Sequence, residues 1–218
     1  MNNEKLQDIQ AIANVMHSVL TVYPESDLIN TFKSNSIGES WPRLSNTDRE
    51  RVGLEHLISY IESWANNEQE IIQLKLDYGN LFYGPGTPIA PPWGSSYTSA
   101  SLLLNDSSTK ELQEFYAAHN INIAMKSNEP IDHIGLIMAV LAFLFEKLQK
   151  QSEDERLKKV ITELLAEHLL PWGDRCLELA YLNAETEYFK GISLIGRDFL
   201  LYIRDLFNVT PRAVAIYR

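Results

Sequence analysis

The chain lacks several features that would assign a function at once. Its 218 residues include a single cysteine, Cys176, which excludes an internal disulfide and any zinc or iron–sulfur site built from cysteines. Basic residues are also scarce, because 19 Lys and Arg face 29 Asp and Glu and leave a net charge of −10. Nucleic-acid binding requires basic side chains against the phosphates, so we expect no nucleic-acid partner. An acidic surface instead attracts a basic partner.

Long apolar segments and targeting signals are missing as well. The longest apolar segment covers the twelve residues 134–145, whereas a membrane-spanning helix needs about 20. The first ten residues, MNNEKLQDIQ, contain neither the basic nor the apolar region of an export signal. We therefore expect a soluble, cytoplasmic protein with no membrane insertion.

The usual catalytic motifs are absent too. The sequence contains no HExxH, no GxxxxGK[ST] and no GxSxG, and its five histidines show no spacing typical of a metal chelate. Cys176 lies among leucines, which favours a buried thiol over a nucleophile. None of these features indicates an enzyme or a cofactor, but their absence does not exclude an enzyme.

Helical periodicity, by contrast, runs through nearly the whole chain. Apolar residues recur at spacings of three and four, the pattern of an amphipathic helix. The clearest stripes are Leu6, Ile9, Ala13, Met16 and Leu20; Leu54, Leu57, Ile58, Ile61 and Trp64; and Tyr188, Ile192, Ile195, Phe199, Ile203 and Leu206. The best strand-like alternation, at Ile121, Ile123 and Met125, is too short to matter. The sequence predicts an all-α fold, a single globular domain over residues 1–218 with about eight to ten helices.

Capping patterns predict where several helices begin. Three pairs place a hydroxyl three residues before a carboxylate, which is the spacing of a capping box: Thr47 and Glu50, Ser108 and Glu111, and Ser152 and Glu155. Pro130 suits the first turn of the apolar helix that follows it, which we expect to run to about residue 147.

The helical pattern stops at residues 83–96, with the sequence YGPGTPIAPPWGSS. Four prolines and three glycines among these fourteen residues predict a loop of imposed shape. We expect this loop to separate two helical lobes. A stiff, apolar loop loses little entropy when it is ordered, so it is a good wall for an apolar ligand.

The residues on either side of that loop have two interpretations. In residues 77–82, DYGNLF, the side chains of Tyr78, Leu81 and Phe82 form either a wall for a ligand or a stripe of the helical core. Trp93 is likewise either a part of the wall or a plug in the core. The residues alone leave both interpretations open.

Two further segments have compositions that an ordinary amphipathic helix would not contain. In residues 129–133, EPIDH, the side chains of Glu129, Asp132 and His133 gather at the mouth of one helix. Asp132 is either a simple helix cap or, with its neighbours, an acceptor for a guanidinium group. Residues 168–172, HLLPW, favour a joint between two helices, since proline ends a helix.

Taken in order, the segments DYGNLF, GPGTPIAPPWGS, EPIDHIG and HLLPW resemble the TorD/DmsD family of redox-enzyme maturation chaperones. The likeness covers residues 2–218, and PPWGS resembles the DmsD-like branch more than the rest of the family. It implies an all-helical cytoplasmic chaperone that is not an enzyme and carries no cofactor. Such a protein holds the twin-arginine leader of a molybdopterin enzyme's catalytic subunit, such as a dimethyl sulfoxide or trimethylamine N-oxide reductase, until the cofactor is inserted.

The resemblance also implies a set of leader-binding positions. They fall on Tyr78, Leu81, Phe82, Pro92, Trp93, Asp132 and His133. Glu129, at the same helix mouth, joins this set as a peptide-binding candidate. Tyr78 stands where other members carry tryptophan, so the packing of an apolar ligand there is expected to differ.

Charge and polarity agree with what the resemblance implies. A twin-arginine leader is basic and carries an apolar segment after its arginines, so an acidic protein with apolar walls would attract it and bury that segment. The competing hypothesis is a metal-dependent hydrolase or another enzyme that uses Asp132, His133 and His168. A third is a helical scaffold that has no client. Stoichiometric metal in the purified protein would favour the enzyme, and binding of leader peptides would favour the chaperone.

Overall fold

The fold is all-α, as the periodicity predicts. The structure is a computed structural model, and it describes every residue except 1, 102–103 and 123–128. Within these described residues the chain forms eleven α-helices and two π-helical segments, and no strand occurs. Of the strand-like alternation, Ile123 and Met125 lie outside the described residues.

The chain divides into two compact units, each assembled from separate stretches of sequence. The first unit comprises Met1–Thr21, Pro92–Arg175 and Leu200–Arg218, and the second comprises Val22–Pro91 and Cys176–Phe199. One boundary falls between Pro91 and Pro92, inside the proline- and glycine-rich segment. Gly84 and Gly86 have φ angles of 66° and 104° there, which favour glycine. The organisation of residues 1–218 as a single domain stays a prediction.

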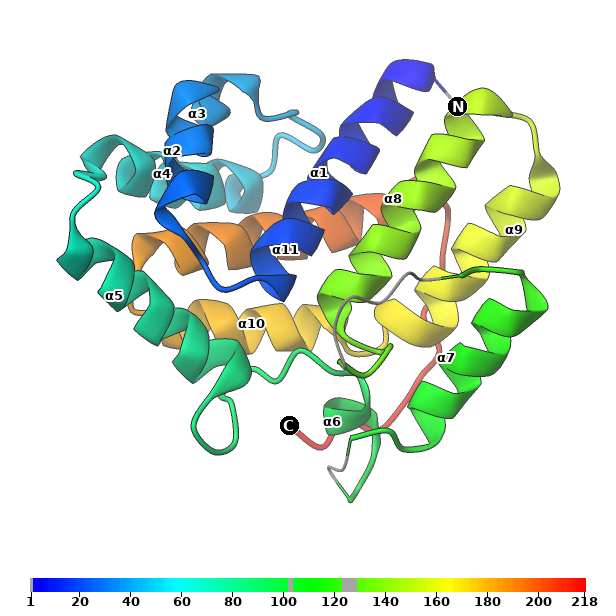
Figure 1. Cartoon of the computed structure of the whole chain (residues 1–218). Coiled ribbons are helices and arrows are strands. Elements are labelled where there is room, and N and C mark those ends of the chain that lie inside the picture. The colour runs from blue at the N-terminus through cyan, green and yellow to red at the C-terminus, as the bar shows by residue number, and fades with distance from the viewer. Residues whose placement is uncertain (1, 102–103, 123–128) are drawn as a thin grey trace. The chain divides into compact units, whose positions relative to one another are not determined.

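The first unit is built around a buried apolar helix. Its helical segments are α1 (Asn3–Thr21), α6 (Ser95–Thr98), α7 (Ser107–Ala118), α8 (Ile134–Lys150), α9 (Glu155–Glu163) and the π-helical η2 (Leu164–Leu169). Helix α1 lies alongside α8 (Figure 1). The approach is close because residue 135 is glycine: a Cβ at Gly135 would lie 2.5 Å from a Thr21 methyl carbon. The His17 ring is hydrogen-bonded to the Gly135 carbonyl oxygen at 2.8 Å.

The second unit contains α2 (Ser26–Ser34), α3 (Ile37–Ser40), α4 (Asp48–Ser63), α5 (Glu68–Tyr78) and the π-helical η1 (Gly79–Tyr83). Two further helices, α10 (Gly173–Asn183) and α11 (Glu187–Leu206), begin in one unit and end in the other. Helix α4 packs against α11 through two glycines. A Cβ at Gly191 would lie 2.7 Å from the Gly53 carbonyl oxygen, so the two backbones meet directly.

Helix starts were only partly predicted. Thr47 caps α4, because its hydroxyl accepts the Glu50 N–H at 3.1 Å, but the capping box is incomplete because the Glu50 carboxylate accepts the N–H groups of Leu44 and Asn46 instead. The other two pairs are wrong. Asp106 caps α7 and Asp154 caps α9, since an aspartate near the helix start accepts the free N–H groups at least as well as serine does. Pro130 does not lie in a first turn either, because α8 begins at Ile134.

No helix among the described residues is both long enough and apolar enough to cross a membrane.

Candidate functional site

The first unit brings two of the candidate segments together. Trp93 and His133 form an isolated antiparallel bridge. On either side of it, the Ile134 N–H donates to the Pro92 carbonyl at 2.7 Å and the Gly94 N–H donates to the Asp132 carbonyl at 3.1 Å. The proline-rich loop and the start of α8 are therefore hydrogen-bonded side by side.

The side chains of this pair of segments also meet. The Trp93 indole N–H donates to a Glu129 carboxylate oxygen at 3.1 Å, and the Trp93 and His133 rings meet edge to face with centroids 6.0 Å apart. Trp93 is 9% exposed and His133 is 4% exposed. Pro92, Trp93, Glu129, Asp132 and His133, which the sequence predicts as binding residues, thus form one cluster, hereafter the Trp93–Asp132 cluster.

Asp132 is the buried charge of this cluster. Its Oδ2 accepts the Ser95 N–H at 2.8 Å and the Thr109 hydroxyl at 3.0 Å, so it ties α6 and α7 to the start of α8. Its Oδ1 is buried and has no hydrogen-bond partner among the described residues. The interpretation of Asp132 as the cap of its own helix is wrong, because His133 takes that position.

His133 caps α8 as a neutral ring. Its Nδ1 accepts the Gly135 N–H at 3.1 Å, which requires that this nitrogen carry no proton. Burial, helped by the nearby His17, lowers the pKa of His133 to about 4. The imidazole is therefore uncharged at neutral pH and offers no positive charge that would repel an incoming guanidinium.

Trp172, from the HLLPW segment at residues 168–172, packs beside the Trp93–Asp132 cluster. Its indole N–H donates to the His168 carbonyl at 2.7 Å, and its ring stacks on Tyr97 at 5.5 Å. A Cβ at Gly94 would lie 2.8 Å from the Trp172 ring, so the loop needs glycine there. The prediction of a helix joint is confirmed, since η2 ends at Leu169 and α10 begins at Gly173.

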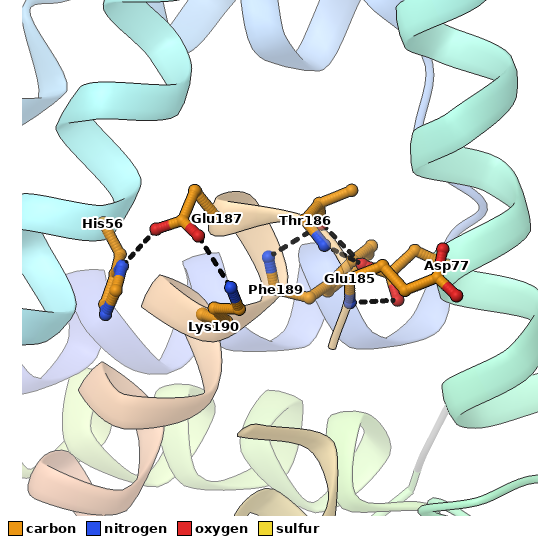
Figure 2. Close-up of polar contacts among 7 residues, drawn as sticks. All are labelled: His56, Asp77, Glu185, Thr186, Glu187, Phe189 and Lys190. Carbon is orange, nitrogen blue, oxygen red and sulfur yellow. Dashed lines mark hydrogen bonds and ion pairs between the residues drawn. The ribbon is translucent and has the colours of Figure 1, made fainter. Parts of the chain in front are cut away.

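In the second unit, the carboxylate of Asp77 fixes the position of the DYGNLF segment. Its two oxygens accept the N–H groups of Glu185 and Thr186 at 3.1 and 2.8 Å and the Thr186 hydroxyl at 2.6 Å (Figure 2). These donors lie just before α11, so Asp77 joins the end of α5 to the start of that helix. Glu187, the first residue of α11, pairs with His56 and Lys190 in the same view (Figure 2).

Asp77 thereby places the aromatic side chains that follow it. Tyr78, Leu81 and Phe82 are buried, with 4%, 0% and 1% exposure. The rings of Tyr78 and Phe82 pack on each other and on Phe189 at centroid distances of 5.5 to 5.9 Å. This is the packing that the core-stripe interpretation describes. The assignment of these three residues to a ligand wall stays a prediction.

Two exposed tyrosines beside this stripe were missed in the sequence. Tyr23 and Tyr83 are 39% and 55% exposed, and their rings lie 5.6 Å apart. Tyr23 also contacts Tyr78 at 4.7 Å. Tyr83 ends η1, and π-helical turns are frequent at functional sites. Only its position directly after DYGNLF could have marked Tyr83, and nothing local marks Tyr23.

The chemistry of the competing enzyme hypothesis finds no support in this geometry. The described residues contain no group of three or more His, Cys, Asp or Glu side chains placed to hold a metal ion. The Oδ2 of Asp132 and the Nδ1 of His133 are both engaged in hydrogen bonds with the protein itself. Cys176 is fully buried, as predicted, with its sulfur near the carbonyls of Ala90 and Pro91.

Comparison with known proteins gives independent evidence about the family of this chain. The family model described as nitrate reductase delta subunit matches residues 46–178. The "Probable Tat proofreading chaperone DmsD" of Haemophilus influenzae is 30% identical over 141 residues, which cover 65% of each chain. The Tat proofreading chaperone DmsD of Salmonella typhimurium is 26% identical over 194 residues, 87% of this chain and 86% of that one. The chaperone protein TorD of Aliivibrio fischeri is 30% identical over 175 residues, 79% of this chain and 78% of that one.

Proposed function

This chain belongs to the TorD/DmsD family, whose members are chaperones rather than enzymes, and we propose that it binds a twin-arginine signal peptide. The peptide would be the leader of a molybdopterin oxidoreductase catalytic subunit, such as a dimethyl sulfoxide or trimethylamine N-oxide reductase. By holding the leader in the cytoplasm, the protein would assist maturation of the enzyme before export.

The observation that carries the proposal is the half-satisfied carboxylate of Asp132. Asp132 is 3% exposed, and in the described structure its Oδ1 accepts no hydrogen bond. Leaving a charged acceptor buried and unpaired is unfavourable. A hydrogen-bond donor that also carries a positive charge would therefore bind to this oxygen most favourably. An arginine guanidinium has five N–H donors in a planar fork that fits a carboxylate.

The apolar part of the leader needs a second surface. The exposed rings of Tyr23 and Tyr83, which adjoin the buried Tyr78, are suited to it. Covering apolar surface yields about 25 cal/mol per Å². Ordering a disordered peptide and moving the side chains that bury Tyr78 and Asp132 offset much of this gain, so we expect a reversible affinity of roughly micromolar order.

Calorimetric titration with a synthetic leader peptide tests the proposal. We expect saturable binding to the intact protein and a marked loss of affinity when both leader arginines are changed to glutamine. If the peptide does not bind, leader recognition is refuted. If both peptides bind equally, Asp132 does not recognise arginine. Capture of the partner from anaerobically grown cells, followed by its identification by mass, then names the client.

A further inference from the structure

A second acidic site lies in the first unit, in a groove between α7 and η2. The groove has a volume of about 430 Å³ and is lined by four carboxylates, Glu111, Glu114, Glu163 and Glu167. The ring of Phe115 forms its apolar wall and lies between the rings of His119 and His168, with centroid distances of 4.6 and 5.1 Å. Carboxylates around an aromatic ring suit an arginine side chain, which pairs through its edge and stacks through its face.

The chain itself already places an arginine in this α7–η2 groove. Residues 209–218 follow α11 without helical structure. In this segment the Arg212 guanidinium contacts Glu111 at 3.0 Å and Glu167 at 3.3 Å. The groove therefore holds a guanidinium between two carboxylates in the present structure.

The backbone of η2 also leaves a carbonyl group in this groove that can accept a hydrogen bond from an extended peptide. In η2 the Leu170 N–H donates to the Leu165 carbonyl, and the next donor in this register would be residue 171, which is proline and has no N–H. The Ala166 carbonyl is consequently left for an outside donor. It accepts the Arg212 N–H at 2.9 Å, and the Tyr217 N–H of the same segment donates to the Tyr97 carbonyl at 3.0 Å.

A small cavity lies between this groove and the Trp93–Asp132 cluster and shares lining residues with both. Arg212, Glu167 and His168 line both the groove and the cavity, and Asp132 and Ser108 line the cavity. The Asp132 Oδ1 and the Ser108 hydroxyl are buried, and neither has a partner in the described part of the chain. With Arg212 in place the cavity has only about 10 Å³ of free volume, the space of roughly one water molecule. The two unpaired oxygens and the volume mark a polar site that Arg212 covers.

We propose that the α7–η2 groove is a second arginine-binding site for the client, and that Arg212 is the internal occupant which a client arginine displaces. The inference rests on the proposed function: a twin-arginine leader offers one guanidinium to Asp132 and another to Glu111 and Glu167. Residues 212–217, RAVAIY, repeat the leader's chemical order of arginine followed by apolar residues. The side chains of Glu111 and Glu167 are 47% and 40% exposed. Exposed pairs are weak, so this occupant is displaceable.

Three variants of the full chain test the proposal by calorimetric titration with the leader peptide. Arg212→Gln removes the competing guanidinium, and we expect it to bind the leader about two- to tenfold more tightly than the parent, the range for one or two exposed ion pairs. Glu111→Gln combined with Glu167→Gln removes the two negative charges that pair with a guanidinium, and we expect it to weaken binding about fivefold. Arg204→Gln is the matched control, because Arg204 pairs with exposed Asp205 outside the groove and the charge change is the same.

Two leader peptides, each with one of its two arginines changed to glutamine, show which arginine binds in the α7–η2 groove. For each single-arginine peptide, the loss of affinity relative to the unchanged leader is measured with the parent and with the Glu111→Gln, Glu167→Gln protein. For the peptide that lacks the groove-binding arginine, we expect a smaller loss with the double variant, because the carboxylates that pair with this arginine are already absent. Equal losses in both proteins, or equal leader affinity of the Arg212→Gln and Arg204→Gln proteins, would overturn the second site while leaving the proposed function intact.

A short probe separates failure of this inference from failure of the proposed function. Acetyl-Arg-Arg-amide is titrated into the Arg212→Gln and Arg204→Gln proteins while the fluorescence of the tryptophans, including Trp172 at the cavity, is recorded. Tighter binding to Arg212→Gln supports the groove even if no leader binds. Equal binding, or none to either protein, overturns it.

Discussion

The substitution Asp132→Asn separates the structural role of this carboxylate from its proposed role in binding. Asparagine has the same shape, and its amide oxygen can take the place of Oδ2 toward the Ser95 N–H and the Thr109 hydroxyl. Both hydrogen bonds then survive, but they change from charge-assisted to neutral. Two such changes cost about 1–3 kcal/mol, and removal of a buried charge offsets part of that cost.

The expected loss of stability is therefore about 1 kcal/mol, which in a chain of this length lowers the melting temperature by about 2–4 °C. The expected loss of leader binding is larger. The guanidinium loses its charged acceptor at Oδ1 and meets an NH₂ group instead, which costs about 1–3 kcal/mol, or roughly five- to 150-fold in Kd. Calorimetric titration and thermal melts of the same preparations measure the two effects separately.

Asp106→Asn is the matched control for this experiment. It changes the net charge equally and lies in the same unit, but Asp106 is the half-buried cap of α7 and does not line the cavity. Asparagine caps a helix about as well as aspartate does. If Asp132→Asn and Asp106→Asn bind the leader equally well, the carboxylate of Asp132 serves the fold alone and the proposed arginine contact is refuted.

Three further outcomes are expected. Trp93→Ala should lower stability by about 3–5 kcal/mol in urea denaturation, because the ring is buried against Glu129 and His133; an unchanged midpoint would mean that the loop is not part of the core. Gly94→Ala should cost about 1–3 kcal/mol in the same assay, since its Cβ would collide with the Trp172 ring, and a neutral result would show that Trp172 can move freely. Burial lowers the pKa of His133 from 6.5 to about 4, so the unfolded chain takes up the proton first as the pH falls. Stability should decrease between pH 6.5 and pH 4 by about 3 kcal/mol from this group, and His133→Asn, which keeps a cap, should flatten that decrease; parallel pH curves for the two proteins would refute this account.

The helices were predictable because the information that specifies them is local. The stripe from Leu6 to Leu20 is buried along α1 as its spacing requires. The errors at helix starts occur where two neighbouring side chains could each cap the helix and the sequence does not decide between them. At α7, for example, Asp106 is the cap and Ser108 is not. Asn67 and Glu70 form the capping box of α5, which the sequence prediction did not include because asparagine offers an amide oxygen in place of the hydroxyl of the predicted caps.

The polar contacts of the candidate site could not be predicted in this way. Asp132 meets Ser95 and Thr109 across 37 and 23 residues of sequence, and Asp77 meets Thr186 across 109. A rule based on spacing contains no information about such distant pairs. The motif resemblance marked Asp132 as important, but only the tertiary structure shows that it joins two helices instead of capping its own.

A comparison of the two buried aspartates distinguishes a structural carboxylate from a functional candidate. Asp77 is 1% exposed, and both of its oxygens accept hydrogen bonds from the residues before α11. Asp132 is equally buried, but only Oδ2 has partners in the described structure. A buried carboxylate whose hydrogen bonds are complete stabilises the fold and has nothing left for a ligand. One that keeps an unpaired oxygen destabilises the free protein, and that cost is recovered when a cationic donor binds. The Asp77 carboxylate therefore positions the start of α11, whereas Asp132 keeps a free acceptor for the guanidinium of the proposed leader.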